Sequence, residues 1–282
     1  MSKARGLADL GNAYDDGALS NRNLIINGAM QVAQRGTSVT GITTAGYRTC
    51  DRWNVSVATG TFTATQGTSG PSEFANTMKI ECTTASASAA SILLEQRIEG
   101  YNLQGLGFGT SDAKPLSLSF WVKSNVVGNY TTEFYSNNSF RQVSKTYSVD
   151  ASGVWEKKTI GIPADTSAGF TNNGGLSLYV LFWLNAATTF KTGTQNTSAW
   201  AAAVNANRVN SDIVNMASTV GNYFEITGVQ LEVGDTATPF EHRSYGDELA
   251  RCQRFYYKPT NLAASNRYAI WQGRVVSGEN YN

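Results

Sequence analysis

The sequence has little of what most catalytic and nucleic-acid-binding proteins need. Its 282 residues include one histidine, three cysteines and a charged fraction of only 15%. The 22 basic and 21 acidic side chains nearly cancel, which leaves a formal net charge of +1. Such a chain has no electrostatic field that would attract it to nucleic acid or to an acidic membrane. We therefore expect neither partner.

The cysteines are too few and too far apart for a disulfide framework or a zinc site. Cys50, Cys82 and Cys252 are odd in number and form no Cys-x-x-Cys pair, so we predict free thiols. The first residues lack the apolar run of a signal peptide, and no stretch approaches the roughly 20 apolar residues of a membrane span. We expect the chain to be made and kept in a reducing cytoplasm before assembly or release.

The single histidine restricts the enzymes that the chain could be. A Ser-His-Asp triad would have to use His242, which lies between Glu241 and Arg243 at an expected junction of strand and helix. The sequence contains no Gly-x-Ser-x-Gly elbow, no phosphate-binding loop and no His-Glu-x-x-His helix. A metal centre built on histidines is excluded by their number. We therefore predict no enzyme activity, no cofactor and no metal.

Glycoside hydrolysis needs only two carboxylates, so the shortage of histidine does not exclude it. Two pairs could be imagined in one groove, namely Glu95 with Glu99 and Glu133 with Glu225. An extended strand would separate Glu95 from Glu99 by about 13 Å, which exceeds either glycosidase geometry. We expect these acids to be solvated or paired with basic residues at the surface.

The composition favours strands joined by tight turns, because Gly, Ser, Thr, Asn and Ala are abundant. Between residues 51 and 241, short β-rich runs recur at the spacing of a sandwich, and we predict an all-β, antiparallel β-sandwich of the jelly-roll kind there. The segment 186–221 is long enough to suggest a role of its own. The predicted strands are 52–57, 61–66, 77–83, 91–99, 116–124, 130–136, 143–149, 156–163, 176–185 and 223–233.

The two ends of the chain differ from its middle. Residues 1–50 contain seven glycines and are predicted to form an extended N-terminal arm. Its one apolar cluster, Leu24, Ile25 and Ile26, is too small to fold alone, so we expect it to attach the arm to another chain or to the main domain. Residues 242–282 are predicted to hold a short helix, near 247–256, and the start of a C-terminal extension of strand and loop.

Sequence blocks occur in a set order along the chain. They are NLIINGAM (23–30), QRGT (34–37), YRTCDRW (47–53), LEQRIEG (94–100), LSFWVKS (118–124), ITGVQLEVG (226–234), PFE (239–241) and RCQRFY (251–256). In this order they resemble bacteriophage tail-fibre and virion structural proteins of the marine and cyanobacterial type. The middle blocks also look like jelly-roll carbohydrate-binding modules.

The resemblance implies a structural component of the virion, a tail fibre or a tail-associated surface protein. It also implies that the chain assembles as a homotrimer, contacts other tail or capsid proteins and can touch host surface glycans. The expected location is the virion surface, after synthesis in the host cytoplasm. Three alternatives remain open: a glycan-binding module for host adsorption, a capsid-decorating protein and a polysaccharide depolymerase.

Strand alternation selects candidate glycan-binding side chains. In the strand 116–124 the apolar residues at even positions should face the core, which turns Trp121 outward. The same alternation in 176–185 turns Tyr179 and Trp183 outward, and Tyr135 would join them if its strand pairs nearby. We predict a polar-aromatic face carrying these four rings, which suits stacking on sugars.

A competing interpretation places the same rings in contacts within the assembly. They could pack beneath the arm, beneath the segment 186–221 or against a neighbouring subunit, and we favour this interpretation because fibre chains bury large apolar areas between subunits. Trp53 and Trp155 are both predicted to be core residues, because large aromatic side chains are highly buried on average.

Overall fold

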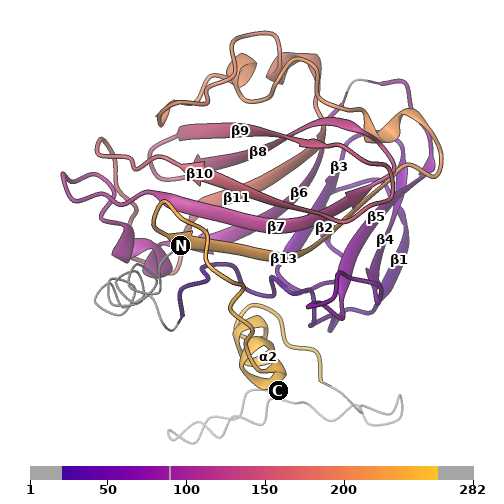
Figure 1. Ribbon diagram of the computed structural model, residues 1–282, viewed down its shortest axis with the longest axis horizontal. Coiled ribbons are helices and arrows are strands. Elements are labelled where there is room, and N and C mark those ends of the chain that lie inside the picture. Colours follow the sequence, from indigo (N-terminus) through magenta and orange to yellow (C-terminus); the bar gives the residue numbers. More distant parts are fainter. Residues whose placement is uncertain (1–20, 89, 260–282) are drawn as a thin grey trace, which may run out of the picture.

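The computed structural model describes residues 21–88 and 90–259 (Figure 1). Its strands are β1 (Ser38–Ile42), β2 (Gly46–Tyr47), β3 (Trp53–Val57), β4 (Thr61–Gly67), β5 (Thr77–Thr84), β6 (Ile92–Glu99), β7 (Leu116–Ser124), β8 (Gly128–Ser136), β9 (Arg141–Val149), β10 (Glu156–Ile162), β11 (Leu176–Asn185), β12 (Ala201–Ala202) and β13 (Tyr223–Val233). One α-helix, α2 (Tyr245–Gln253), follows them, and four short 3-10 turns span Gly100–Leu106, Thr188–Phe190, Asn205–Asn207 and Met216–Ser218.

The strands form two sheets that pack face to face. One sheet has six strands in the order β1-β4-β5-β13-β7-β10, and the other has seven in the order β12-β9-β8-β11-β6-β3-β2. All of the strand pairs within these sheets are antiparallel. The predicted fold class is therefore confirmed: the protein is an antiparallel β-sandwich with a short C-terminal helix. No helix of the described residues is long and apolar enough to cross a membrane.

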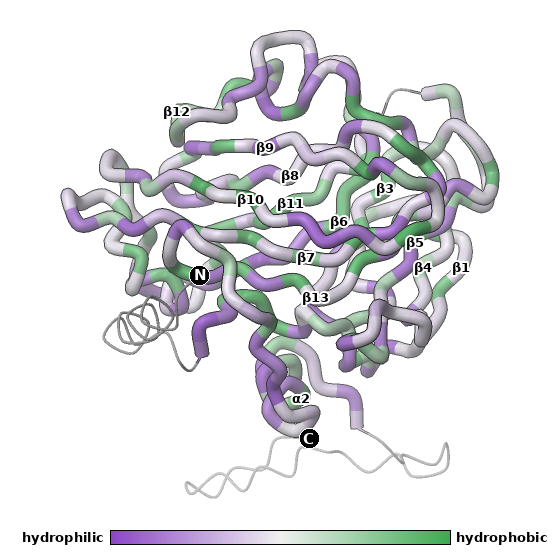
Figure 2. Tube along the Cα trace, in the orientation of Figure 1, coloured by the Kyte–Doolittle hydropathy of each residue, from purple (hydrophilic) through white to green (hydrophobic). Residues whose placement is uncertain are grey.

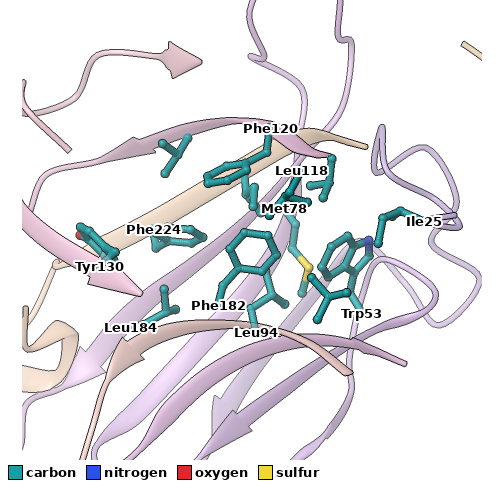
Figure 3. Packing of buried hydrophobic residues seen from close by; sticks show 14 of the residues in the cluster. Ile25, Trp53, Met78, Leu94, Leu118, Phe120, Tyr130, Phe182, Leu184 and Phe224 are labelled. Carbon is teal, nitrogen blue, oxygen red and sulfur yellow. The ribbon is translucent and has the colours of Figure 1, made fainter. Parts of the chain in front are cut away.

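The core lies between the sheets and follows the predicted alternation. The inward side chains of β7 and β11 are fully buried: Leu116, Leu118, Phe120, Val122, Leu178, Val180, Phe182 and Leu184. The rings of Phe120 and Phe182 meet edge to face across the two sheets, with centroids 5.1 Å apart (Figure 3). Burial of each such side chain stabilises the fold by about 1.5–3 kcal/mol, so the sheets are held together chiefly by this layer.

The described part of the predicted arm, residues 21–50, lies against the sandwich and contributes β1 and β2 to its sheets. Ile25 and Met30 belong to the core, and the backbone N–H of Leu24 donates to the carbonyl oxygen of Leu231 at 2.8 Å. Trp53 packs in the same region, is fully buried as predicted, and donates from its indole Nε1 to the carbonyl oxygen of Asn27 at 3.0 Å. The start of the described chain is thus part of the folded body.

The helix α2 forms where the sequence predicted one and docks on this N-terminal segment. Ser244 caps it by accepting a hydrogen bond from the backbone N–H of Asp247 at 3.2 Å, and acidic residues occupy the first turn. Its buried Cys252 packs against Ile26 and Val32. The strand and loop predicted after Tyr256 fall mostly outside the described residues, as do residues 1–20.

Candidate functional site

A groove crosses the outer face of the six-stranded sheet. Its volume is about 460 Å³. Alternation along the strands turns its polar side chains away from the core, because their neighbours Ile80, Phe224 and Val122 point inward and are fully buried. The groove is lined by Thr63, Thr65 and Gly67 of β4, Lys79, Glu81 and Thr83 of β5, Tyr223 and Glu225 of β13, Lys123 of β7, and Ser69 of the connection between β4 and β5.

The register of the strands arranges part of this lining in a row. Lys79 pairs with Thr65 on one side and with Glu225 on the other. Glu225 pairs in turn with Lys123. Since neighbouring strands lie about 4.8 Å apart, the row spans roughly 14 Å across the sheet. The groove therefore offers hydroxyl, ammonium and carboxylate groups at regular intervals.

Ion pairs hold the charged groups of the groove in place. Lys123 Nζ lies 2.6 Å from Glu225 Oε2, while the hydroxyl of Thr77 donates to Glu225 Oε1 at 2.6 Å. Lys79 pairs with Glu81 along its own strand. Both oxygens of Glu225 thus have partners, and its side chain is 5% exposed. A carboxylate held in this way can orient a ligand but does not stand free as an acid or a nucleophile.

Two aromatic rings accompany the two lysines. Lys123 Nζ lies 4.7 Å from the ring centroid of Trp155, and Lys79 Nζ lies 4.7 Å from that of Tyr223. The indole Nε1 of Trp155 donates to the carbonyl oxygen of Ser69 at 3.2 Å, which fixes the orientation of the ring at the end of the groove. Both rings are half-buried, so part of each surface faces the solvent.

The four predicted ring residues do not share one face. Tyr135 and Tyr179 pair directly across β8 and β11, with ring centroids 6.0 Å apart, on the outer face of the seven-stranded sheet. Trp183 lies on the same face, further along β11. Trp121 lies on the six-stranded sheet, beside Thr227, one row from the groove. Alternation determines the side of a strand on which a residue lies, but not the sheet to which that strand belongs.

Trp183 is covered by the segment 186–221 and is only 1% exposed. It packs with Val209 and Ile213 of that segment, and its Nε1 donates to Glu133 Oε2 at 2.8 Å. Arg208 pairs with the same carboxylate, with Nε 2.8 Å from Oε1. For Trp183 the competing interpretation, packing beneath the long segment, agrees with the structure. Burial raises the pKa of Glu133, although Arg208 and Trp183 oppose this shift.

Neither imagined carboxylate pair converges. Glu133 and Glu225 lie on different sheets, with outward side chains on opposite faces of the sandwich. Glu95 pairs with Arg97, and Glu99 pairs with Arg254, so the predicted pairing with basic residues is found. The predicted surface location is wrong, because all four glutamates are buried beneath their partners. Within residues 21–88 and 90–259, no group of three or more His, Cys, Asp or Glu side chains could hold a metal ion.

His242 is exposed beside two aromatic rings, whereas the predicted attachment residues pack within the protein. The His242 ring lies 4.9 Å from Phe240 and 5.3 Å from Phe74, measured between centroids. Ile25 is fully buried, Ile26 is 8% exposed and Leu24 is partly buried against the core. The attachment role assigned to these three residues stays a prediction, and their apolar side chains pack within their own chain.

The sequence did not indicate the groove, because the residues that line it are spread over strands far apart in the chain. Trp155 was predicted to be a core residue, and this was wrong, since the ring is half-buried at the surface and contacts Lys123. The available signal was the alternation of charged and apolar residues in 78–82 and 223–226, which marks two half-solvated strands. Nothing in that pattern indicates that the two strands are neighbours.

Comparison with known proteins gives structural likenesses only. No protein-family model and no curated protein matches the chain. A tailspike enzymatic domain of bacteriophage CBA120 is similar over 75% of this chain and 21% of its own, with 13% identity and a TM-score of 0.39. A putative sugar-binding protein of Bacteroides thetaiotaomicron is similar over 75% of this chain and 100% of its own, with 16% identity and a TM-score of 0.42.

A family 11 carbohydrate-binding module from Clostridium thermocellum, in complex with a mixed-linked β-1,3-1,4-tetrasaccharide, is also similar. The likeness covers 72% of this chain and 98% of the module, with 13% identity and a TM-score of 0.32. What these three proteins bind or cleave is a property of those proteins.

Proposed function

We propose that the chain is a non-catalytic, glycan-binding surface component of a tailed-phage particle, and that the groove on the six-stranded sheet holds the glycan. One observation carries the proposal: a row of hydroxyl and paired charged groups lies beside two solvent-facing aromatic rings, Trp155 and Tyr223. Sugars combine an apolar ring face with a rim of hydroxyl groups, so a site for them needs both kinds of surface.

The arrangement favours binding over bond cleavage. A glycosidase needs one carboxyl group that gives up a proton and a second that attacks or activates water. In the groove Glu225 is occupied by Lys123 and Thr77, and Glu81 is occupied by Lys79. Fixed, paired charges of this kind form hydrogen bonds to several hydroxyl groups without reorganisation, which lowers the entropic cost of binding.

The predicted effect of the groove on binding can be measured by isothermal titration calorimetry with glycans that score on an array. We expect Trp155→Ala and Tyr223→Ala each to weaken binding by about ten-fold or more, because a truncated aromatic anchor loses its stacking surface. Tyr101→Ala is the matched control, since Tyr101 is 58% exposed and does not line the groove. Unchanged affinity in both groove variants would contradict the proposed site, and a blank array would contradict glycan binding.

The virion location and the homotrimer rest on the resemblance of the sequence blocks to phage tail-fibre proteins. If the chain is a homotrimer, native mass spectrometry at micromolar concentration should show a defined trimer. If it lies on the tail, an antibody against it should label the tail in electron micrographs of the particle. Label on the head would favour the capsid-decorating alternative. A monomer that captures no other virion protein would contradict the assembly role.

A further inference from the structure

A second cavity lies between the C-terminal end of α2, the edge strand β2 and the turn that precedes β3. Its volume is about 160 Å³, below that of most small-molecule sites. Figure 1 shows α2 at one end of the sandwich, and Figure 2 shows hydrophilic positions along much of this helix. Charged and aromatic side chains form most of the walls, namely Arg35, Tyr47, Asp51, Arg52, Phe255 and Tyr256.

Four arginines lie in or beside this cavity, and three of them have a carboxylate partner. The pairs are Arg35 with Asp51, Arg97 with Glu95 and Arg254 with Glu99. Arg52 is the fourth arginine, and it forms no ion pair with any carboxylate among residues 21–88 and 90–259. One positive charge in this region is therefore not compensated by the described chain.

The uncompensated charge is also the most deeply buried of the four. Arg52 is 8% exposed, and its guanidinium carbon lies 3.5 Å from the ring centroid of Phe255. Its Nη2 donates to the carbonyl oxygen of Arg97. Nη1 has no hydrogen-bond partner in the described part of the chain and, unlike Nε, is not fully enclosed. Since Arg52 lines the cavity, Nη1 is the nitrogen that a ligand in the cavity can reach.

A buried, unpaired guanidinium points to an anion. Buried charges in proteins are normally paired, because an isolated charge is costly to remove from water. Guanidinium groups bind carboxylates and phosphates most strongly, through charge-assisted hydrogen bonds. An anion that enters the cavity would supply the missing partner of Arg52.

The other walls restrict the kind of anion. A phosphate group carries about −1.5 to −2 charges at neutral pH, so the carboxylate of Asp51 repels it more than it repels a singly charged carboxylate. A water molecule takes up about 30 Å³, which leaves room for about five groups of that size. The rings of Tyr47 and Tyr256 offer apolar surface to the carbon atoms next to the charge. These walls favour a small carboxylate.

We propose that this cavity binds the carboxylate group of an organic acid, with Arg52 as its main charge partner. Two ligands carry this chemistry: a short free acid that fits entirely, and a sugar acid whose ring would lie outside the cavity. The inference does not depend on the groove, which lies on the six-stranded sheet.

The two sources are distinguished by titrating sodium acetate and sodium glucuronate into the full chain. Sodium chloride and sodium phosphate are the comparisons, at neutral pH and constant ionic strength, and binding is followed by calorimetry and by the rise in melting temperature. A response to acetate supports a site for free acids, and a response to glucuronate alone supports a site for sugar acids. Tighter binding of phosphate than of either acid would overturn the proposed class of ligand.

Two variants of neighbouring residues should change the affinity in opposite directions. We expect Arg52→Met to weaken carboxylate binding by about ten-fold or more, because the charge-assisted hydrogen bond is lost. Asp51→Asn should strengthen it by about three-fold or more, because a negative charge leaves the wall. Arg251→Met is the matched control, since Arg251 is half-buried on α2 and does not line the cavity, and it should bind as the wild type does.

Three further results would contradict the inference. The first is no response to either acid in the wild type, and the second is equal binding by Arg52→Met. The third is weaker binding by Asp51→Asn, which would mean that Asp51 holds the site together instead of opposing the ligand. Because Asp51→Asn is expected to gain affinity, the inference stays testable even if Arg52→Met does not fold.

Discussion

Replacing Arg208 by alanine is expected to lower the free energy of unfolding by about 3–5 kcal/mol. Glu133 is fully buried, and Arg208 is its only positive partner among the residues that the structure describes, with contacts of 2.8 Å and 3.1 Å. Without the guanidinium, the buried carboxylate of Glu133 keeps one side-chain hydrogen bond, which the indole N–H of Trp183 donates. Chemical denaturation monitored by tryptophan fluorescence measures the change.

The Arg208→Ala defect should depend on pH with a definite sign. Burial already raises the pKa of Glu133, and loss of Arg208 removes the charge and the hydrogen bonds that oppose this shift, so the pKa rises further. A raised carboxyl pKa means that the folded state binds the proton more tightly than the unfolded state does. The free energy of unfolding then falls as the pH rises through the pKa that Glu133 has in the folded state. The deficit relative to the wild type should therefore shrink as the pH is lowered.

Two variants make this prediction specific. The double variant Glu133→Leu/Arg208→Met replaces the buried pair by apolar groups and should recover most of the lost stability. Lys79→Ala breaks a half-exposed pair, with side chains 33% and 37% exposed, and should cost no more than about 1 kcal/mol. An Arg208→Ala protein that is as stable as Lys79→Ala, at every pH, would show that the buried pair does not hold the segment 186–221 in place.

Asn27→Ala is expected to destabilise the fold by about 3 kcal/mol or more, because this fully buried side chain joins three backbone groups. Its Nδ2 donates to the carbonyl oxygens of Val32 and Asp51 at 2.8 Å and 2.9 Å, and its Oδ1 accepts from the N–H of Val32 at 3.0 Å. Asn27 also has φ of +60°, in the left-handed region that asparagine tolerates and alanine does not.

Comparison with Asn27→Gly separates these two causes. Glycine adopts positive φ without strain, so it should lose only the hydrogen bonds and be more stable than the alanine variant by about 1 kcal/mol. Asn137→Ala, at an exposed asparagine, should change stability by no more than about 0.5 kcal/mol. Equal melting curves for Asn27→Ala, Asn27→Gly and the wild type would contradict the role of Asn27 as the residue that joins the N-terminal segment to the sandwich.

Much of the fold could be predicted from the pattern of side chains. The bounds of β7, β11 and β13 were predicted to the residue, because alternation of apolar and polar side chains runs through each strand and ends at turn residues. The strands β1 and β2 were missed. They lie in the glycine-rich stretch, have five and two residues, and are held by pairing with β4 and β3 instead of by a local pattern.

The candidate site was less predictable than the fold. Alternation correctly turned Tyr179 outward, and β8 does pair beside it to bring Tyr135 close. It could not show that Trp121 belongs to the other sheet, or that Val209 and Ile213 would cover Trp183. Both facts depend on pairings between residues far apart in the chain, and a local pattern contains no information about such pairings.

The position of β13 has a consequence for synthesis. It is the last strand of the described chain, yet it lies in the middle of its sheet, between β5 and β7. In this sheet β13 joins the strands β1, β4 and β5 on one side to β7 and β10 on the other. Until residues 223–233 emerge from the ribosome, these two parts of the sheet cannot be connected by hydrogen bonds. The nascent chain therefore carries two open strand edges from the synthesis of β7 until the synthesis of β13, and the sheet closes only when this central strand arrives.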